Sequence, residues 1–198
     1  MLDYVTLKKA IIDFPDLEGE ADIEANIALI VELGEARIGR AVHLAGNLKS
    51  LSVDGGTGFY RWPSDCVEVD RITVLSGAKY AFRPAAEVVA AQNSTSSCSN
   101  TNIWAIDGRT LIFSPDIGDF VLKYYSRTTP LATLNTNWLL DEAPDLYLYA
   151  GLCEAARFSK EAEQEMSRYE NAFAGIVAAL RLQDAEASVA RSAPIRRR

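Results

Sequence analysis

The segment LNTNWLLDEAPDLYLYAGLCEA, from Leu134 to Ala155, joins a polar turn to a proline and then to a long apolar run. Pro144 fits the first turn of a helix, where its missing N–H removes no hydrogen bond, and Asp145 favours the positive end of the helix dipole. The segment therefore predicts a turn that leads into a buried helix over residues 144–158.

The apolar side chains of this helix share one face, because helical spacing relates Leu146, Tyr149, Ala150 and Cys153. Base stacking on its aromatic residues would need neighbouring basic side chains, which this acidic chain offers only sparsely. We therefore interpret three aromatic residues as packing anchors, in the core or at a subunit contact: Trp138, Tyr147 and Tyr149.

The same periodicity predicts helices over residues 5–13, 21–42 and 160–182. Ser159 suits the N-cap of the last of these helices, although one continuous helix from residue 144 onward is an alternative. The last helix carries an apolar seam formed by Met166, Tyr169, Phe173, Ile176 and Leu180. We assign this seam to the core of the same domain, since it is too short to indicate an intermolecular coiled coil.

Two glycines, Gly34 and Gly39, interrupt the helix predicted over residues 21–42. Each lowers the helix propensity by about 1 kcal/mol relative to alanine, so their presence needs a reason. Close packing against another helix supplies that reason.

Residues 48–127 have strand periodicity instead. LKSLSVDGGTGFYRW (48–62) predicts two strands around a hairpin turn, and CVEVDRITVL (66–75) predicts a strand with a bulge where the inward-facing parity changes. IWAIDGRTLIFS (103–114) predicts a hairpin with Asp107-Gly108 at its turn. NSTSSCSNTN (93–102) predicts a polar loop.

Helices that precede and follow a run of strands predict an α+β protein. We expect a helical bundle with an inserted antiparallel β-hairpin region and an extended C-terminal arm. The body would span residues 1–183, with the β insertion at 48–127, and the arm would span 184–198, where the apolar periodicity is lost.

Charge divides the chain into an acidic body and a basic end. The net charge is −7, but the final segment SVARSAPIRRR holds four arginines and no acid, which leaves 16 basic residues against 27 acidic ones in the rest. A solvated tail is one interpretation, and an arm that docks on a partner surface is the other. The residues that would form the docking arm are Arg191, Pro194, Ile195, Arg196, Arg197 and Arg198.

Clusters of carboxylates are the best candidates for catalysis: Glu18 with Glu20, Asp141 with Glu142, and Glu161 with Glu163 and Glu165. Glycoside hydrolysis needs two carboxylates at a fixed separation in a cleft. Each cluster lies at a predicted helix start, where acids stabilise the dipole, so the structural interpretation is favoured.

The remaining reactive residues are few. His43 is the only histidine, and the three cysteines (Cys66, Cys98 and Cys153) are far apart, which indicates buried thiols and predicts neither a metal site nor a cofactor. VDGGTG (53–58) lacks the Lys-Ser/Thr of a phosphate loop. No apolar stretch reaches the ~20 residues of a membrane span.

Several segments follow one another in a characteristic order. YVTLKKAIIDF (4–14) precedes a long helix that ends in E-x-R-I-x-R at Glu35, Arg37, Ile38 and Arg40. WPSDCVEVDRI (62–72), WAIDGRTLIFSPDIGDFVLKYYSR (104–127) and TNWLLDEAPDLYLYAGLCEAA (136–156) follow, the last being the most specific. Together they resemble the head–tail adaptor (head completion) proteins of short-tailed and related tailed bacteriophages. The resemblance covers residues 2–182, although Trp62 and Cys66 stand where the family often has leucine and phenylalanine.

This resemblance implies a non-enzymatic structural protein of the virion, made in the host bacterial cytoplasm and placed at the head–tail junction. Family members form a ring on the portal protein, usually of twelve copies, extend the DNA channel, and present a platform for tail nozzle, hub or fibre proteins. An extended C-terminal segment commonly runs along the portal, which would give the basic arm a role. An acidic ring would let double-stranded DNA pass without sequence-specific binding.

Two other functions remain open from the residues alone. A peptidoglycan-cleaving hydrolase would use two of the carboxylates, and a nucleic-acid-binding module would use the arginine tail. The acidic body argues against strong binding of nucleic acid.

Overall fold

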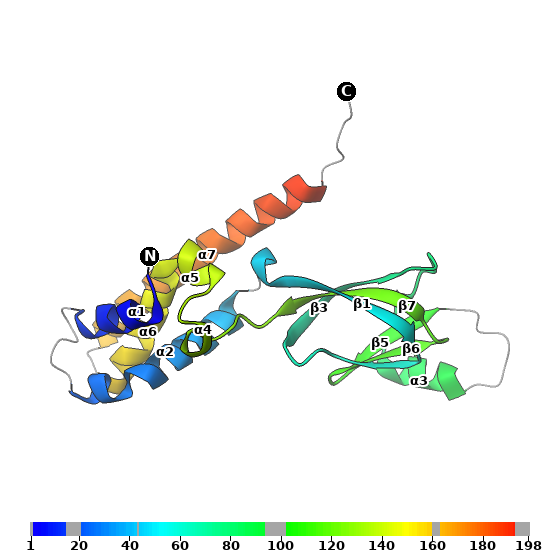
Figure 1. The fold of residues 1–198 in the computed structure, drawn as a ribbon, viewed down its shortest axis with the longest axis horizontal. Coiled ribbons are helices and arrows are strands. Elements are labelled where there is room, and N and C mark those ends of the chain that lie inside the picture. The colour runs from blue at the N-terminus through cyan, green and yellow to red at the C-terminus, as the bar shows by residue number, and fades with distance from the viewer. Residues whose placement is uncertain (1, 15–20, 43, 94–101, 160–162, 193–198) are drawn as a thin grey trace, which may run out of the picture. The chain divides into compact units, whose positions relative to one another are not determined.

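The computed structural model describes residues 2–14, 21–42, 44–93, 102–159 and 163–192. The chain divides into two units, each with its own core. The helical unit comprises residues 1–47 and 128–198, and the β unit comprises residues 48–127 (Figure 1). The predicted α+β class, with a β region inserted into a helical bundle, is confirmed.

The helical unit is built around one buried helix, α6 (Pro144–Ser159), whose burial extends almost around its circumference. Its other elements are α1 (Tyr4–Ile12), α2 (Ala21–Ala41), the 3₁₀ turn η1 (Ala45–Asn47), α4 (Leu131–Leu134), α5 (Trp138–Glu142) and α7 (Glu163–Ser192). The seam on α7 lies in the core of this unit, with Tyr169 and Phe173 buried, so its assignment to the same domain is confirmed.

Gly34 allows α2 to lie against α6. A Cβ atom at this position would come within 3.2 Å of the Gly151 nitrogen and 3.3 Å of the Ala150 carbonyl carbon, so the two backbones are in near contact. The prediction for Gly39 is wrong, because a Cβ atom there would meet nothing within 4 Å. Gly39 is exposed, and the periodicity around it could not reveal which glycine faces a neighbour.

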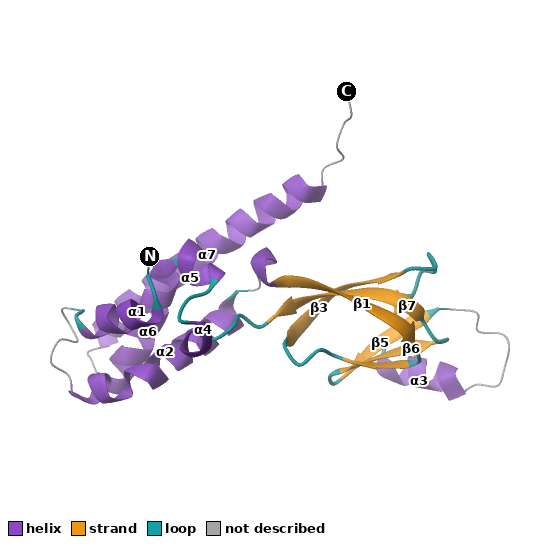
Figure 2. Cartoon of the chain, in the orientation of Figure 1, coloured by secondary structure: helices purple, strands orange, loops and turns teal. Residues whose placement is uncertain are grey.

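The β unit contains two sheets that enclose a second core, which includes Phe113, Phe120 and Leu122 (Figure 2). Its elements are β1 (Leu48–Gly56), β2 (Phe59–Arg61), β3 (Cys66–Val74), β4 (Ala81–Phe82), α3 (Ala85–Asn93), β5 (Ile103–Asp107), β6 (Thr110–Ser114) and β7 (Gly118–Ser126). One sheet has the order β1-β7-β3 and the other has the order β2-β6-β5-β4.

The hairpin predicted for β5 and β6 is confirmed, with Gly108 at φ +58° in its turn. The bulge predicted in β3 is also present, since its register on β7 shifts between Val69 and Arg71. The hairpin predicted over residues 48–62 is wrong. β1 pairs with β7 and β2 pairs with β6, so the chain changes sheets between them.

Gly58 lies at this change of sheet. Its carbonyl accepts hydrogen bonds from the Phe113 N–H at 2.9 Å and from the Gln92 side chain at 3.2 Å. A Cβ atom here would lie 2.9 Å from Gln92 Nε2, so a larger residue would require the end of this side chain to move away from the Gly58 carbonyl. The glycines do mark a turn between β1 and β2, but the pairing partners of these strands are determined by contacts with residues that are distant in sequence.

The extended arm expected from residue 184 needs a correction as well, because α7 continues as a helix to Ser192 (Figure 1). Loss of the apolar stripe does not end the helix here, because five of the nine residues from 184 to 192 are alanine, glutamate or arginine, which have high helix propensity. A helix that is already nucleated by packing also extends without a new nucleus.

No helix in the described ranges is long and apolar enough to cross a membrane.

Candidate functional site

The segment that ends in α6 is held by a buried hydrogen-bond cluster around Asn137. This asparagine is the N-cap of α5, where its Oδ1 accepts the Leu140 N–H at 2.9 Å. Its Nδ2 lies 2.9 Å from the hydroxyl of Tyr147, and both side chains are buried. Burial raises the pKa of the Tyr147 phenol, so this hydroxyl stays protonated and structural at neutral pH.

The other two predicted anchors lie in the same unit. The indole N–H of Trp138 donates to Asn47 Oδ1 at 3.1 Å, and its ring covers Gly46 so closely that a Cβ atom there would lie 2.5 Å from Cη2. Tyr149 is half-buried against the core. These contacts give the segment 134–155 a packing role within the helical unit.

The E-x-R-I-x-R motif at the end of α2 has a physical explanation in contacts with distant residues. Glu35 accepts the backbone N–H of Leu131 at 2.9 Å, at the start of α4, and Ile38 is buried. Burial raises the pKa of Glu35 above its ordinary value, and the hydrogen bond from Leu131 partly offsets this effect.

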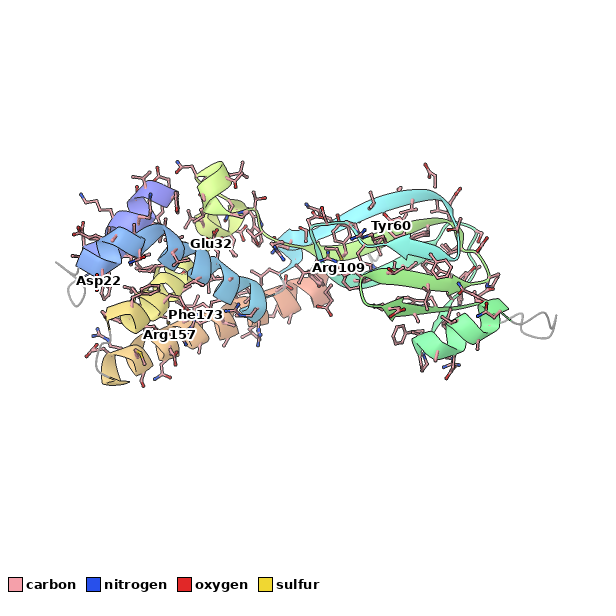
Figure 3. The ribbon with its side chains drawn as sticks, turned by 90° about the horizontal axis from the view of Figure 1, so that it is seen from below. Asp22, Glu32, Tyr60, Arg109, Arg157 and Phe173 are labelled. Carbon is pink, nitrogen blue, oxygen red and sulfur yellow. The ribbon has the colours of Figure 1, made fainter. Side chains whose placement is uncertain are left out.

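Arg37 is the centre of an ion network that joins three helices. Its Nε lies 2.7 Å from Oε1 of Glu154 on α6, and its guanidinium carbon lies 5.6 Å from the ring centre of Phe173 on α7. Arg157 connects Glu154, at 3.4 Å, to Glu170 on α7, at 3.1 Å. Figure 3 shows Arg157 and Phe173 on these adjacent helices. The network fixes the positions of α2, α6 and α7 relative to one another.

Sequence reasoning did not find Glu154 as the partner of Arg37. Nothing local pointed to it, because the two residues are 117 positions apart. The available signal was the motif itself, in which an arginine stands one turn from Gly34 on a helix predicted to pack closely.

The carboxylates proposed for catalysis do not form a pair in a cleft where the structure describes them. Asp141 is exposed in the first turn of α5 and accepts a hydrogen bond from Thr136 Oγ1 at 3.3 Å. Glu165 forms a surface ion pair with Arg168 at 3.5 Å. Glu18, Glu20 and Glu161 lie outside the described residues.

The described thiols are unreactive. Cys66 and Cys153 are both free and buried, and desolvation raises the pKa of each to about 11. A thiol with this pKa is protonated at neutral pH and is a poor nucleophile. Among the residues that the structure places, no group of histidine, cysteine and acidic side chains could hold a metal ion. Cys98 and His43 fall outside that part of the chain.

The basic C-terminal residues begin on α7. Arg191 lies in the last turn of this helix, whereas Pro194, Ile195, Arg196, Arg197 and Arg198 lie outside the described residues. Two contacts hold α7 just before this segment, since Asp184 accepts the Ala45 N–H at 3.1 Å and Arg181 donates to the Ala41 carbonyl. Asp184 therefore lies about two helical turns before Arg191.

A family model described as SU10 adaptor protein matches residues 2–198, which is nearly the whole chain. No curated protein matches the sequence.

Proposed function

The chain belongs to the SU10 adaptor protein family, structural proteins of the phage virion that serve as head–tail adaptors, and we propose that it assembles as a ring under the portal protein. In this proposal the ring, of twelve copies, extends the DNA channel and provides the docking platform for tail proteins. The family match over residues 2–198 is the observation that carries the proposal.

The proposed point of attachment to the portal is the segment that begins with Arg191 and ends at Arg198. The contacts of Arg181 and Asp184 on α7 precede this segment, so the attachment that we propose does not require either contact to break. Four arginines suit a polar or acidic groove, and Ile195 supplies an apolar contact. Several contacts are needed, because ordering each residue costs about 1–2 kcal/mol of backbone entropy.

The acidic body supports the proposed passage of DNA. Without its last eleven residues the chain has 16 basic and 27 acidic groups, so a ring of copies would carry a large negative charge. Such a wall repels phosphates and lowers the friction on a passing duplex.

A pull-down on purified portal protein tests the attachment. Deletion of residues 188–198 leaves Asp184 and its contact with Ala45 in place, so the variant keeps its folded core. We expect the full-length protein to bind and the deletion to lose most of the binding. A matched variant with Arg196, Arg197 and Arg198 replaced by glutamine separates charge from chain length. Equal binding by all three proteins would remove the C-terminal segment from the proposal.

A further inference from the structure

The β unit carries a groove of about 540 Å³ beside strand β3. Residues 70–74 of β3 form one side, and the groove is also lined by the turn at 77–80 and by Trp104 of β5. The groove belongs to the β unit, whereas the C-terminal segment proposed to bind the portal belongs to the helical unit.

One side of the groove is an open strand edge. β3 ends its sheet and pairs only with β7 among the strands that the structure describes. The Leu75 N–H donates to the Asp119 carbonyl on β7, so alternation along an antiparallel pair turns the backbone of Ile72 away from β7. Its N–H and C=O therefore face the open side, where an added strand could pair with them.

The groove combines apolar surface with positive charge. Ile72, Tyr80 and Trp104 are half-buried beside the core of the unit, and Phe82 extends this surface, with its ring 5.0 Å from that of Trp104 and 58% of the residue exposed. Trp104 and Tyr80 line the groove, and tryptophan and tyrosine are typical anchors for a bound chain.

Two cations, Arg71 and Lys79, and one acid, Asp70, line the groove. Neither cation forms an ion pair with any residue that the structure describes. This local positive charge contrasts with the net charge of −7 of the whole chain. A partner with carboxylates is therefore favoured, whereas the arginine-rich C-terminus of a second copy would be repelled.

We propose that this groove binds an extended, acidic segment of a tail protein by addition of a strand to β3. The added strand would exchange backbone hydrogen bonds with Ile72, direct alternate apolar side chains toward Trp104 and Tyr80, and direct its carboxylates toward Arg71 and Lys79. The identity of the partner as a tail protein rests on the proposed adaptor function, but the chemistry of the groove does not.

The full-length protein can be titrated with a capped peptide of alternating valine and glutamate, about six residues long to match a typical strand. The measurements are ¹H–¹⁵N chemical shifts and the hydrogen exchange of the Ile72 amide. We expect shifts confined to the groove and exchange at Ile72 slowed by about tenfold or more, because the amide gains a partner. No shift at a peptide concentration of about 1 mM would overturn the proposal.

Two controls test the two parts of the recognition. A peptide with the same side chains but N-methylated amides should lose binding, because it cannot pair with the strand edge. The double variant Arg71→Glu, Lys79→Glu should weaken binding of the valine–glutamate peptide by about three- to tenfold and favour a valine–lysine peptide instead. Binding that ignores both changes would contradict strand addition. Competition by a short DNA duplex that depends on Arg71 and Lys79 would assign the groove to nucleic acid and would also overturn it.

Failure here can be distinguished from failure of the adaptor function. If the protein binds the portal but not the peptide, only the proposal of strand addition at the groove is wrong. If the protein binds the peptide but not the portal, only the proposed attachment to the portal is wrong.

Discussion

Arg37 on α2 and Glu154 on α6 are 117 positions apart in sequence, and their side chains meet at 2.7 Å with little exposure to solvent. A buried carboxylate that loses its cation keeps the cost of desolvation without the compensating attraction. The pair therefore decides how firmly the central helix is held against α2.

Replacing Arg37 by methionine should lower the free energy of unfolding by about 2–4 kcal/mol, since Glu154 is then left with Arg157 alone. Urea denaturation measures this change. Arg168→Met is the matched control, because Arg168 pairs with Glu165 at the surface and should contribute less than about 0.5 kcal/mol. Equal effects of the two substitutions would show that the Arg37–Glu154 pair contributes no more than a surface pair.

The two glycines of α2 should respond in opposite directions to alanine. Gly34→Ala places a methyl group against the backbone of α6 and should destabilise the protein by about 1–2 kcal/mol. Gly39→Ala meets open space and should stabilise the protein by up to about 1 kcal/mol through helix propensity. Thermal unfolding of both variants checks the difference, and the same sign of change in both would contradict the close packing of α2 on α6.

Asn137→Ala should destabilise the protein by about 2–3 kcal/mol, because it removes the cap of α5 and leaves the Tyr147 hydroxyl without its buried partner. Asn135→Gly is the control two residues earlier. Asn135 has φ +63°, which glycine adopts without strain, so we expect a change below about 1 kcal/mol. Chemical denaturation of the two variants compares their stabilities. A small effect of Asn137→Ala would show that the hydrogen bonds of Asn137 contribute little to the stability of the protein.

Glu35 should make stability depend on pH in a direction that is unusual for a carboxyl group. Because burial raises its pKa in the folded state above the ordinary value of 4.5, folding favours the protonated form. Its contribution to stability is complete below the unfolded pKa and is lost as the pH rises through the folded pKa. Glu35→Gln should therefore gain stability relative to the wild type at pH ~7, and this gain should shrink toward pH ~4.

Urea denaturation at several pH values measures that difference. Glu24→Gln, on the exposed side of the same helix, removes an equal charge and serves as the control. A gain for Glu35→Gln that is independent of pH, or one that Glu24→Gln reproduces, would show that the protonation of Glu35 is not its cause.

Local chemistry was predictable from the sequence, and long-range partners were not. The turn at Asp107-Gly108 and the close approach at Gly34 followed from what these residues allow at their own positions. The pairing of β1 with β7 did not, because a strand carries the same alternation whichever neighbour it has. The helical state of residues 184–192 was missed because amphipathic periodicity reports burial, whereas alanine and charged residues sustain a helix without it.

The same limit applied to the candidate sites. The basic C-terminus is visible in the composition, since it depends only on which residues are present. The groove beside β3 depends on which strand ends its sheet and on Trp104 being brought beside Arg71 and Lys79 by the fold. No local sequence pattern shows that β3 lies at the edge of its sheet or that Trp104 lies near these two residues.

The central claim is that this protein joins the head to the tail. The most direct test uses phage particles made without it, to which the purified protein is then added back. We expect DNA-filled heads without tails, and infectious particles once the full-length protein is supplied. Particles that carry tails and infect cells in its absence would contradict a role of this protein in joining head and tail.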